Sequence, residues 1–225
     1  MIDSAIRAVF FDAVGTLIVP SAPVARTYTE VAPRRGVHCI EEEVRERFRE
    51  AFARQEKIDR EAAWQTSETR ERARWRAIVS EVLPGAEGAF EDLWAWFSTP
   101  AAWTIHPDAG EVLRELANRH IAVGMASNFD SRLLGLVESF PELAPVRGRC
   151  AISSLIGWRK PAPEFFRNVA QLAGCQTAQV LHVGDDRKND VEGAIAAGMQ
   201  AILYAPQGAD NDDPHIRRLR DLLPA

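Results

Sequence analysis

A short apolar run that ends in one carboxylate constrains the fold of this chain more than any other feature. The segment Val9–Leu17 reads Val-Phe-Phe-Asp-Ala-Val-Gly-Thr-Leu, so Asp12 directly follows apolar residues and a Gly-Thr turn comes soon after it. A short, wholly apolar run predicts a strand covered on both faces, as in parallel sheets. Open α/β sheets bind ligands at the carboxyl ends of such strands. The segment therefore predicts a buried strand that carries Asp12 to the functional edge of a sheet.

The composition is typical of a soluble globular chain with enough apolar residues for a full core. Of 225 residues, 46% are hydrophobic and 26% are charged, with a formal net charge of −5. This balance indicates neither a nucleic-acid partner nor binding to an acidic membrane. No apolar run has the length of a membrane span or the pattern of a signal sequence. Cys39, Cys150 and Cys175 lack metal-site or disulfide spacing, so we expect free thiols in a cytoplasmic protein.

From about residue 21 to residue 100, the pattern predicts helices only. Apolar residues recur at helical spacing within a charged background, which gives three stripes. The tryptophans of these stripes are interpreted as helix-packing residues rather than as ligand contacts. The stripes are Val44, Phe48, Ala51 and Phe52; Trp75, Ile78, Val79 and Val82; and Phe90, Leu93, Trp94 and Phe97.

After Trp103, helical segments alternate with apolar strand-like runs. This alternation predicts βαβ units and a parallel sheet. We therefore predict an α/β fold, with a Rossmann-like doubly wound parallel-sheet core at residues 1–17 and 103–225 and an inserted all-helical cap domain at residues 18–102. A cap beside the first strand is placed to exclude water from the site. The predicted strands are 121–126, 150–152, 180–183 and 201–204, and the predicted helices are 107–120, a segment around 133–137, 164–173 and 191–197.

Four polar clusters follow these strands or lie on a loop between them. They are Asp12, Ser127-Asn128, Lys160-Pro161 and the acidic segment Gly184–Asp190. Strand ends of one parallel sheet converge, so these groups can face one cavity. Carboxylates that approach one another raise each other's pKa, and a bound Mg²⁺ relieves the repulsion. A lysine ammonium and a serine hydroxyl can then hold phosphate oxygens, which indicates phosphoryl transfer with a carboxylate nucleophile.

The four clusters, in this order, resemble the four motifs of the haloacid dehalogenase-like (HAD) hydrolase superfamily. The helical block resembles the cap of the C1 type that this superfamily inserts after its first motif, so the resemblance covers nearly the whole chain. The wording Phe-Asp-Ala-Val-Gly-Thr-Leu, with Ser-Asn-Phe-Asp and His-Val-Gly-Asp, is most similar to the haloacid dehalogenase-like hydrolase domain-containing 3 group.

The resemblance implies a Mg²⁺-dependent phosphatase that acts on a small phosphorylated metabolite through an aspartyl-phosphate on Asp12. Lys160 would pair with the nucleophile and with phosphate, and Asp190 would act in the outer shell by orienting Lys160 or a metal-bound water. Asp186 could take the role of Asp185 or of Asp190. The implied substrate-binding residues are Ser127, Asn128, Lys160 and Thr16, and the implied metal site is Asp12, the Val14 carbonyl, Asp185 and Asp190.

Val14 departs from the motif of the phosphatases. They place an aspartate there, which protonates the leaving group and then activates water, and such general acid–base catalysis is worth ~10²–10⁴ in rate. One alternative is a substrate with a good leaving group, such as an acyl or aryl phosphate. A second is an acid supplied from elsewhere, for which His38 in the cap and His106 are candidates. A third is a reaction that needs no acid.

Three other functions stay open at this point. The chain could bind phosphate with little or no turnover. It could act as a 2-haloacid dehalogenase, although the acidic segment would be hard to explain in a metal-free halide site. It could act as a phosphonatase with Lys57, the one lysine of the cap, as a Schiff base, although a lone lysine at a helix end is more typical of a solvated charge. His182 is predicted to be a hydrogen-bonded core residue, and residues 210–213 a solvated turn. The sequence sets no oligomeric state.

Overall fold

The apolar run before Asp12 forms the central strand of the sheet in the computed structural model, which describes residues 2–209 and 215–224. Strand β1 (Ala8–Phe11) pairs in parallel with β4 (Ala122–Ser127) on one side and with β6 (Val180–Gly184) on the other. Among the described residues the strand order is β5-β4-β1-β6-β7-β8, and each pairing is parallel. The predicted doubly wound α/β core is thereby confirmed. The outer strands are β5 (Cys150–Ile152), β7 (Gln200–Tyr204) and β8 (His215–Ile216).

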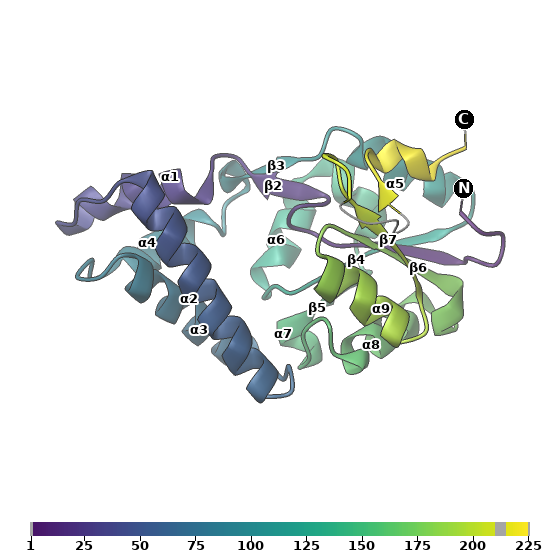
Figure 1. Cartoon of the computed structure of the whole chain (residues 1–225). Coiled ribbons are helices and arrows are strands. Elements are labelled where there is room, and N and C mark those ends of the chain that lie inside the picture. Colours follow the sequence, from purple (N-terminus) through teal and green to yellow (C-terminus); the bar gives the residue numbers. More distant parts are fainter. Residues whose placement is uncertain (1, 210–214, 225) are drawn as a thin grey trace.

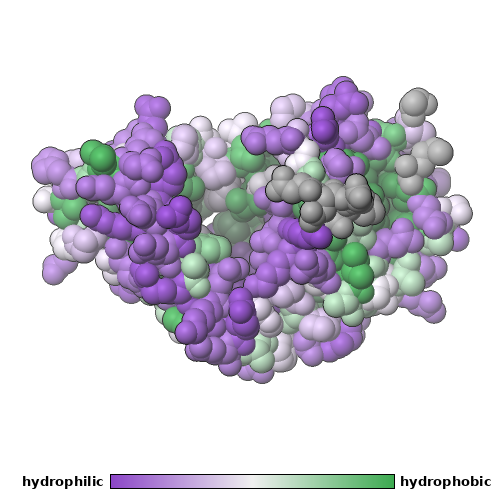
Figure 2. Space-filling model, in the orientation of Figure 1, coloured by the Kyte–Doolittle hydropathy of each residue, from purple (hydrophilic) through white to green (hydrophobic). Residues whose placement is uncertain are grey.

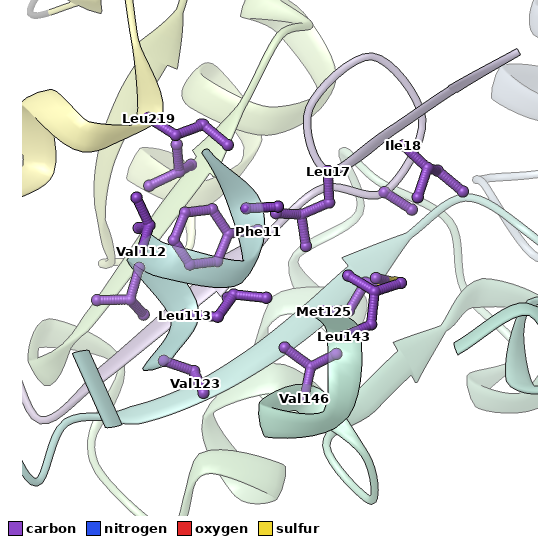
Figure 3. Close-up of a cluster of buried hydrophobic side chains, with 14 of the residues drawn as sticks. Phe11, Leu17, Ile18, Val112, Leu113, Val123, Met125, Leu143, Val146 and Leu219 are labelled. Carbon is purple, nitrogen blue, oxygen red and sulfur yellow. The ribbon is translucent and has the colours of Figure 1, made fainter. Parts of the chain in front are cut away.

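Helices cover both faces of this sheet (Figure 1). Successive side chains of a strand point to opposite faces, so Val9 and Phe11 enter one hydrophobic cluster whereas Ala8 and Phe10 enter another. Figure 3 shows the first cluster, in which Phe11 lies among side chains from helices and loops of that face. Helices α5 (Ala109–Asn118) and α6 (Arg132–Ser139) pack on this face, α8 (Pro163–Ala173) and α9 (Gly193–Ala196) pack on the other, and the short α7 (Ser153–Ile156) follows β5.

The inserted segment forms a separate helical lobe, the cap (Figure 1). The three apolar stripes predicted from the sequence pack against one another and around Tyr28 in a hydrophobic cluster of their own. The Ser67 side chain accepts a hydrogen bond from the Arg70 N–H at 3.1 Å and thereby caps the third helix. The cap helices are α1 (Val24–Val31), α2 (Glu41–Glu61), α3 (Glu68–Val82) and α4 (Ala89–Trp96).

A two-stranded antiparallel sheet joins the cap to the core. Strand β2 (Ile18–Pro20) pairs with β3 (Trp103–Ile105) where the chain leaves the core and where it returns. Neither strand is predicted from the sequence, because Pro20 and Thr104 interrupt the short apolar runs. The predicted domain boundaries, at 17/18 and 102/103, fall at this small sheet and stay a prediction.

The segment before α9 differs from its prediction. A helix was expected over 191–197, but Arg187–Glu192 forms a π-helical turn and α9 covers only Gly193–Ala196. The helical turn begins four residues before the predicted start. The Asp186 carboxylate caps it by accepting the backbone N–H groups of Lys188 and Asn189, both at 2.9 Å. Such π turns are frequent at functional sites.

Other expectations concern cysteines, membranes and the acidic tail. Cys39, Cys150 and Cys175 are free thiols, as predicted. Among the described residues, no helix combines the length and the apolar character needed to cross a membrane. The solvated turn predicted at residues 210–213 lies outside the described residues.

Candidate active site

The polar clusters predicted from the sequence lie along one edge of the parallel sheet. Asp12 follows β1 directly, and its N–H donates to the Val183 carbonyl of β6 at 2.8 Å. The parallel register of β1 with β4 and β6 places Asp12 beside the carboxyl ends of both strands. Ser127 ends β4, and Asp185 follows β6. The structure therefore brings these three residues to a common edge.

Lys160 links two of the carboxylates at this edge. Its ammonium donates to Asp12 Oδ1 at 2.6 Å, to Asp190 Oδ1 at 2.6 Å and to the Ala126 carbonyl at 2.9 Å. An ammonium has three N–H donors, so these contacts use all of them. Burial lowers the pKa of Lys160, but the two carboxylates outweigh burial and hold that pKa above its usual value. Burial raises the pKa of Asp12, and Lys160 opposes that rise only in part.

Asp190 is fixed by three hydrogen bonds. Besides Lys160, the His182 ring nitrogen Nε2 contacts Asp190 Oδ1 at 2.9 Å, and the Asp186 N–H donates to Asp190 Oδ2 at 3.0 Å. Burial would raise the pKa of Asp190, but Lys160 and His182 bring it well below its usual range. His182 is fully buried and hydrogen-bonded, as predicted. Its contact with Asp190 was missed, because two residues eight positions apart carry no signal of contact in a sequence.

Asp185 completes a group of three carboxylates. One oxygen from each of Asp12, Asp185 and Asp190 lies within 4.8 Å of the others. The Thr16 hydroxyl donates to Asp185 Oδ1 at 3.3 Å. Gly15 has a φ of +94°, and a Cβ atom there would lie 2.3 Å from Asp185 Oδ2, so only glycine allows this approach. Partial desolvation, together with Asp12 and Asp190, raises the pKa of Asp185 to about 7.

The chemistry of this group fits a divalent cation with oxygen ligands. Three carboxylates outnumber the one ammonium in a partly buried site, and desolvation together with this excess of negative groups raises the pKa of Asp185. Mg²⁺ prefers one or two carboxylates together with substrate oxygens. Asp12 and Asp185 are the fitting carboxylates, since both oxygens of Asp190 already accept hydrogen bonds.

Asn128 and Asp186 make local contacts with their own loops. The Asn128 amide donates to the Lys160 carbonyl at 3.0 Å, and its oxygen accepts the Lys160 N–H at 2.7 Å. Asn128 therefore holds the loop that carries Lys160. The Asp186 carboxylate is engaged by the N–H groups of the following turn, which favours Asp185 and Asp190 for the two roles that the sequence left open.

The two histidines considered as replacement acids, His38 and His106, and the cap lysine Lys57 are not part of the carboxylate group around Lys160. His106 Nδ1 accepts the Asp108 N–H at 3.1 Å, and Nε2 contacts the Tyr204 hydroxyl at 2.8 Å, so both ring nitrogens have partners. His38 is exposed on the segment between α1 and α2, and Lys57 is exposed on α2.

The segment before Lys160 is bonded to the cap, which sequence analysis did not predict. The Arg159 N–H donates to the Trp64 carbonyl of the α2–α3 connection at 2.9 Å. The Arg159 guanidinium pairs with Glu71 and lies 3.6 Å from Asp59, and all three side chains are buried. This network holds the cap against the core on the Lys160 side of the site.

The sheet, the inserted helices and the four clusters define a known class of protein. The family model of the haloacid dehalogenase-like hydrolases matches residues 6–198. The chain therefore belongs to this hydrolase family.

Individual relatives agree with this assignment. Human haloacid dehalogenase-like hydrolase domain-containing protein 3 is 29% identical over 220 residues, which cover 91% of this chain and 84% of that protein. Two solved structures, a HAD phosphatase from Thermococcus onnurineus (21% identity) and an L-2-haloacid dehalogenase from Xanthobacter autotrophicus (20% identity), each give a TM-score of 0.72 and cover 96% of both chains. At these identities the structures show the shared fold. The resemblance to the domain-containing 3 group is confirmed by the human relative.

Proposed function

We propose that this chain is a Mg²⁺-dependent phosphatase that acts on a small phosphorylated metabolite through an aspartyl-phosphate on Asp12. The observation that carries the proposal is the position of the Lys160 ammonium, 2.6 Å from both Asp12 and Asp190, beside the third carboxylate of Asp185. Such a site can hold a phosphate dianion against a carboxylate nucleophile only if further positive charge is present. Mg²⁺ held by Asp12 and Asp185, with the Val14 carbonyl as a further ligand, would supply that charge.

The side chains then divide the work of binding and attack. The Ser127 hydroxyl would hold a phosphate oxygen, and the Lys160 ammonium would offset part of the phosphate charge, while Asn128 and Asp190 keep Lys160 in place. The Asp12 carboxylate would attack phosphorus, and the bond to the leaving oxygen would break with its electron pair on that oxygen. Water would then hydrolyse the aspartyl-phosphate and restore Asp12.

Val14 weakens two of these steps in the proposal. A valine side chain neither protonates the leaving oxygen nor activates the attacking water. We therefore expect a dependence on good leaving groups and a slow second step, so that the aspartyl-phosphate accumulates.

The alternatives fit the site less well. Dehalogenation without a metal would leave three carboxylates, those of Asp12, Asp185 and Asp190, with only one ammonium to offset them. A Schiff-base mechanism would need a lysine of the cap at the site, and Lys57 is exposed on α2. Phosphate binding without turnover uses the same residues as the proposal, and kinetics separate the two.

The test is phosphate release from p-nitrophenyl phosphate and from acetyl phosphate, with Mg²⁺ and with EDTA. We expect release that requires Mg²⁺ and that disappears in Asp12→Asn. If neither compound is hydrolysed, the phosphatase proposal fails. Thermal stabilisation by phosphate and Mg²⁺ in the absence of turnover would then identify a binding protein.

A further inference from the structure

An apolar cavity of about 300 Å³ is lined by residues of both the cap and the core. Its core side is formed by residues of the loops that carry the site: Val14 lies two positions after Asp12, and Phe129 directly follows Asn128. Aromatic residues of the cap form much of the opposite side, among them Trp75 and Trp94. Figure 2 shows the surface hollowed between the two lobes, with hydrophobic residues around the hollow. Tryptophans that the sequence assigned to helix packing therefore also line a cavity.

The cavity offers no unpaired charge to a ligand. Arg132 is the one charged residue among the described residues that line it. Its guanidinium donates to both carboxylate oxygens of the buried Asp130, from Nε and from Nη2, each at 2.7 Å. Its central carbon lies 3.4 Å from the centroid of the Trp94 ring. Burial raises the pKa of Tyr28, which keeps its phenol neutral.

The size and character of the cavity indicate what it holds. An apolar protein cavity of ~150 Å³ accommodates a benzene molecule, so about twice that volume accommodates a two-ring group. A charged group would lose its hydration there without gaining an unpaired partner. An uncharged aromatic group would exchange water for contact with other rings.

Val14 links this cavity to the chemistry of the site. An aspartate at this position would place a carboxylate in an apolar lining, whereas the valine side chain is part of that lining. Phenolates are weaker bases than alkoxides, so they leave phosphorus with less help from a general acid. The same residue thus explains the missing acid and contributes to the apolar lining.

We propose that the substrate is a phosphate monoester of an uncharged phenol, with its rings in this cavity and its phosphate at the charged edge, facing the Asp12 carboxylate. This inference rests on the proposed function. In the first step, Asp12 forms a bond to phosphorus, the bond from phosphorus to the phenolic oxygen breaks, and the phenolate takes its proton from solvent.

The first test compares three esters whose leaving phenols have similar acidity: phenyl phosphate, 2-naphthyl phosphate and O-phosphotyrosine. We expect kcat/KM for 2-naphthyl phosphate to exceed that for phenyl phosphate by about tenfold, because a second ring is buried. We expect O-phosphotyrosine to fall at least about tenfold below phenyl phosphate, because its charged groups must lose water.

A matched pair of variants tests whether the preference for 2-naphthyl phosphate arises from binding in the cavity. Val24 is a half-buried lining residue at the start of α1, whereas Glu30 is exposed on the same helix and is not part of the lining. In Val24→Trp the indole occupies cavity volume, so kcat/KM for 2-naphthyl phosphate should fall about tenfold while that for acetyl phosphate stays within about twofold. Glu30→Trp should change neither value.

Two results would overturn the inference and leave the proposed function intact. The first is hydrolysis of acetyl phosphate with no preference for 2-naphthyl over phenyl phosphate. The second is an equal loss of both activities in Val24→Trp, with circular dichroism showing a folded protein. Absence of phosphate release from every compound, acetyl phosphate included, would overturn the proposed function and this inference with it.

Discussion

The two sides of Val14 differ sharply in what they offer a ligand. On one side, Lys160 and three carboxylates form a charged group in which each contact is directional. On the other side, the cavity is lined by rings and aliphatic side chains, and its one charged residue is already paired. Under the proposed function, electrostatic interactions would hold the phosphate and burial of apolar surface would hold the leaving group.

The difference predicts unequal tolerance to substitution. Removing one member of a buried charge pair leaves the other uncompensated and typically lowers the free energy of unfolding by about 3–5 kcal/mol. Changing one side chain of an apolar wall alters affinity by about 1–3 kcal/mol for a matching ligand. Substitutions at the charged edge should therefore affect every substrate, whereas those in the cavity should affect only substrates that fill it.

The largest effect is expected from Asp185, and its neighbour supplies the control. Asp185→Asn removes a carboxylate from the candidate Mg²⁺ site and should lower kcat/KM roughly 10³-fold on every phosphate ester, since the metal contributes several kcal/mol. Asp186→Asn should leave activity within about twofold, because asparagine caps the following turn as well as aspartate does. Equal losses in the two variants would contradict this assignment.

Val14→Asp should sharpen the comparison by placing an acid at the border of the two regions. On alkyl phosphates, we expect kcat to rise about 10²-fold, the lower end of what general acid–base catalysis contributes. On 2-naphthyl phosphate the gain should be smaller, because a phenolate needs less protonation and the new carboxylate faces the apolar wall. Val14→Asn has a similar size and no acid, so it should give no gain. No gain in a folded Val14→Asp would show that another step limits turnover.

Asn128→Ala tests whether the charged edge depends on the loop that carries Lys160. The substitution removes two hydrogen bonds to the Lys160 backbone and should lower kcat/KM about tenfold or more. The loss should be the same for acetyl phosphate and for 2-naphthyl phosphate, because the cavity is untouched. A loss confined to 2-naphthyl phosphate would assign Asn128 to the leaving group instead.

The smallest effect concerns the contact between cap and core at Glu68. Burial raises the pKa of Glu68, but hydrogen bonds from Ser154 and Ser131 outweigh burial and bring it below its usual value. The ionised form therefore stabilises the folded state above about pH 4, and this contribution disappears as the pH falls through the lowered pKa. Because Glu68 is exposed, we expect Glu68→Gln to reduce stability by only a few tenths of a kcal/mol at neutral pH.

Urea unfolding of the wild type and of Glu68→Gln from pH 7 to pH 3 measures this contribution. The two stabilities should converge as the pH falls below 4. Glu87→Gln, on an exposed loop, should run parallel to the wild type throughout. Parallel curves for Glu68→Gln would show that Glu68 does not link cap to core in solution.

The fold was predictable because its signals are local. An apolar run such as Ala8–Phe11 identifies a buried strand, and the carboxyl ends of parallel strands must meet, so Asp12, Ser127 and Asp185 could be placed together without coordinates. Strands β2 and β3 were not predicted because Pro20 and Thr104 interrupt their short apolar runs.

Contacts between distant segments could not be predicted in the same way. Asn128 bonds the backbone of Lys160, 32 positions away, and His182 contacts the carboxylate of Asp190, 8 positions away. The sequence does not indicate which partner each side chain meets. The cavity depends on how the cap lies on the core, and a helical stripe with Trp94 reads the same whether it packs on a helix or borders a cavity.

The central claim is that Asp12 accepts the phosphoryl group, and its capture on that residue tests the claim most directly. The protein is mixed with p-nitrophenyl phosphate and Mg²⁺, quenched in acid within the first turnover, digested and examined by mass spectrometry. Our account predicts one phosphoryl group on the peptide that contains Asp12, together with a burst of about one nitrophenolate per protein, and neither in Asp12→Asn. Turnover without a labelled Asp12 peptide, or a phosphoryl group on another residue, would contradict it.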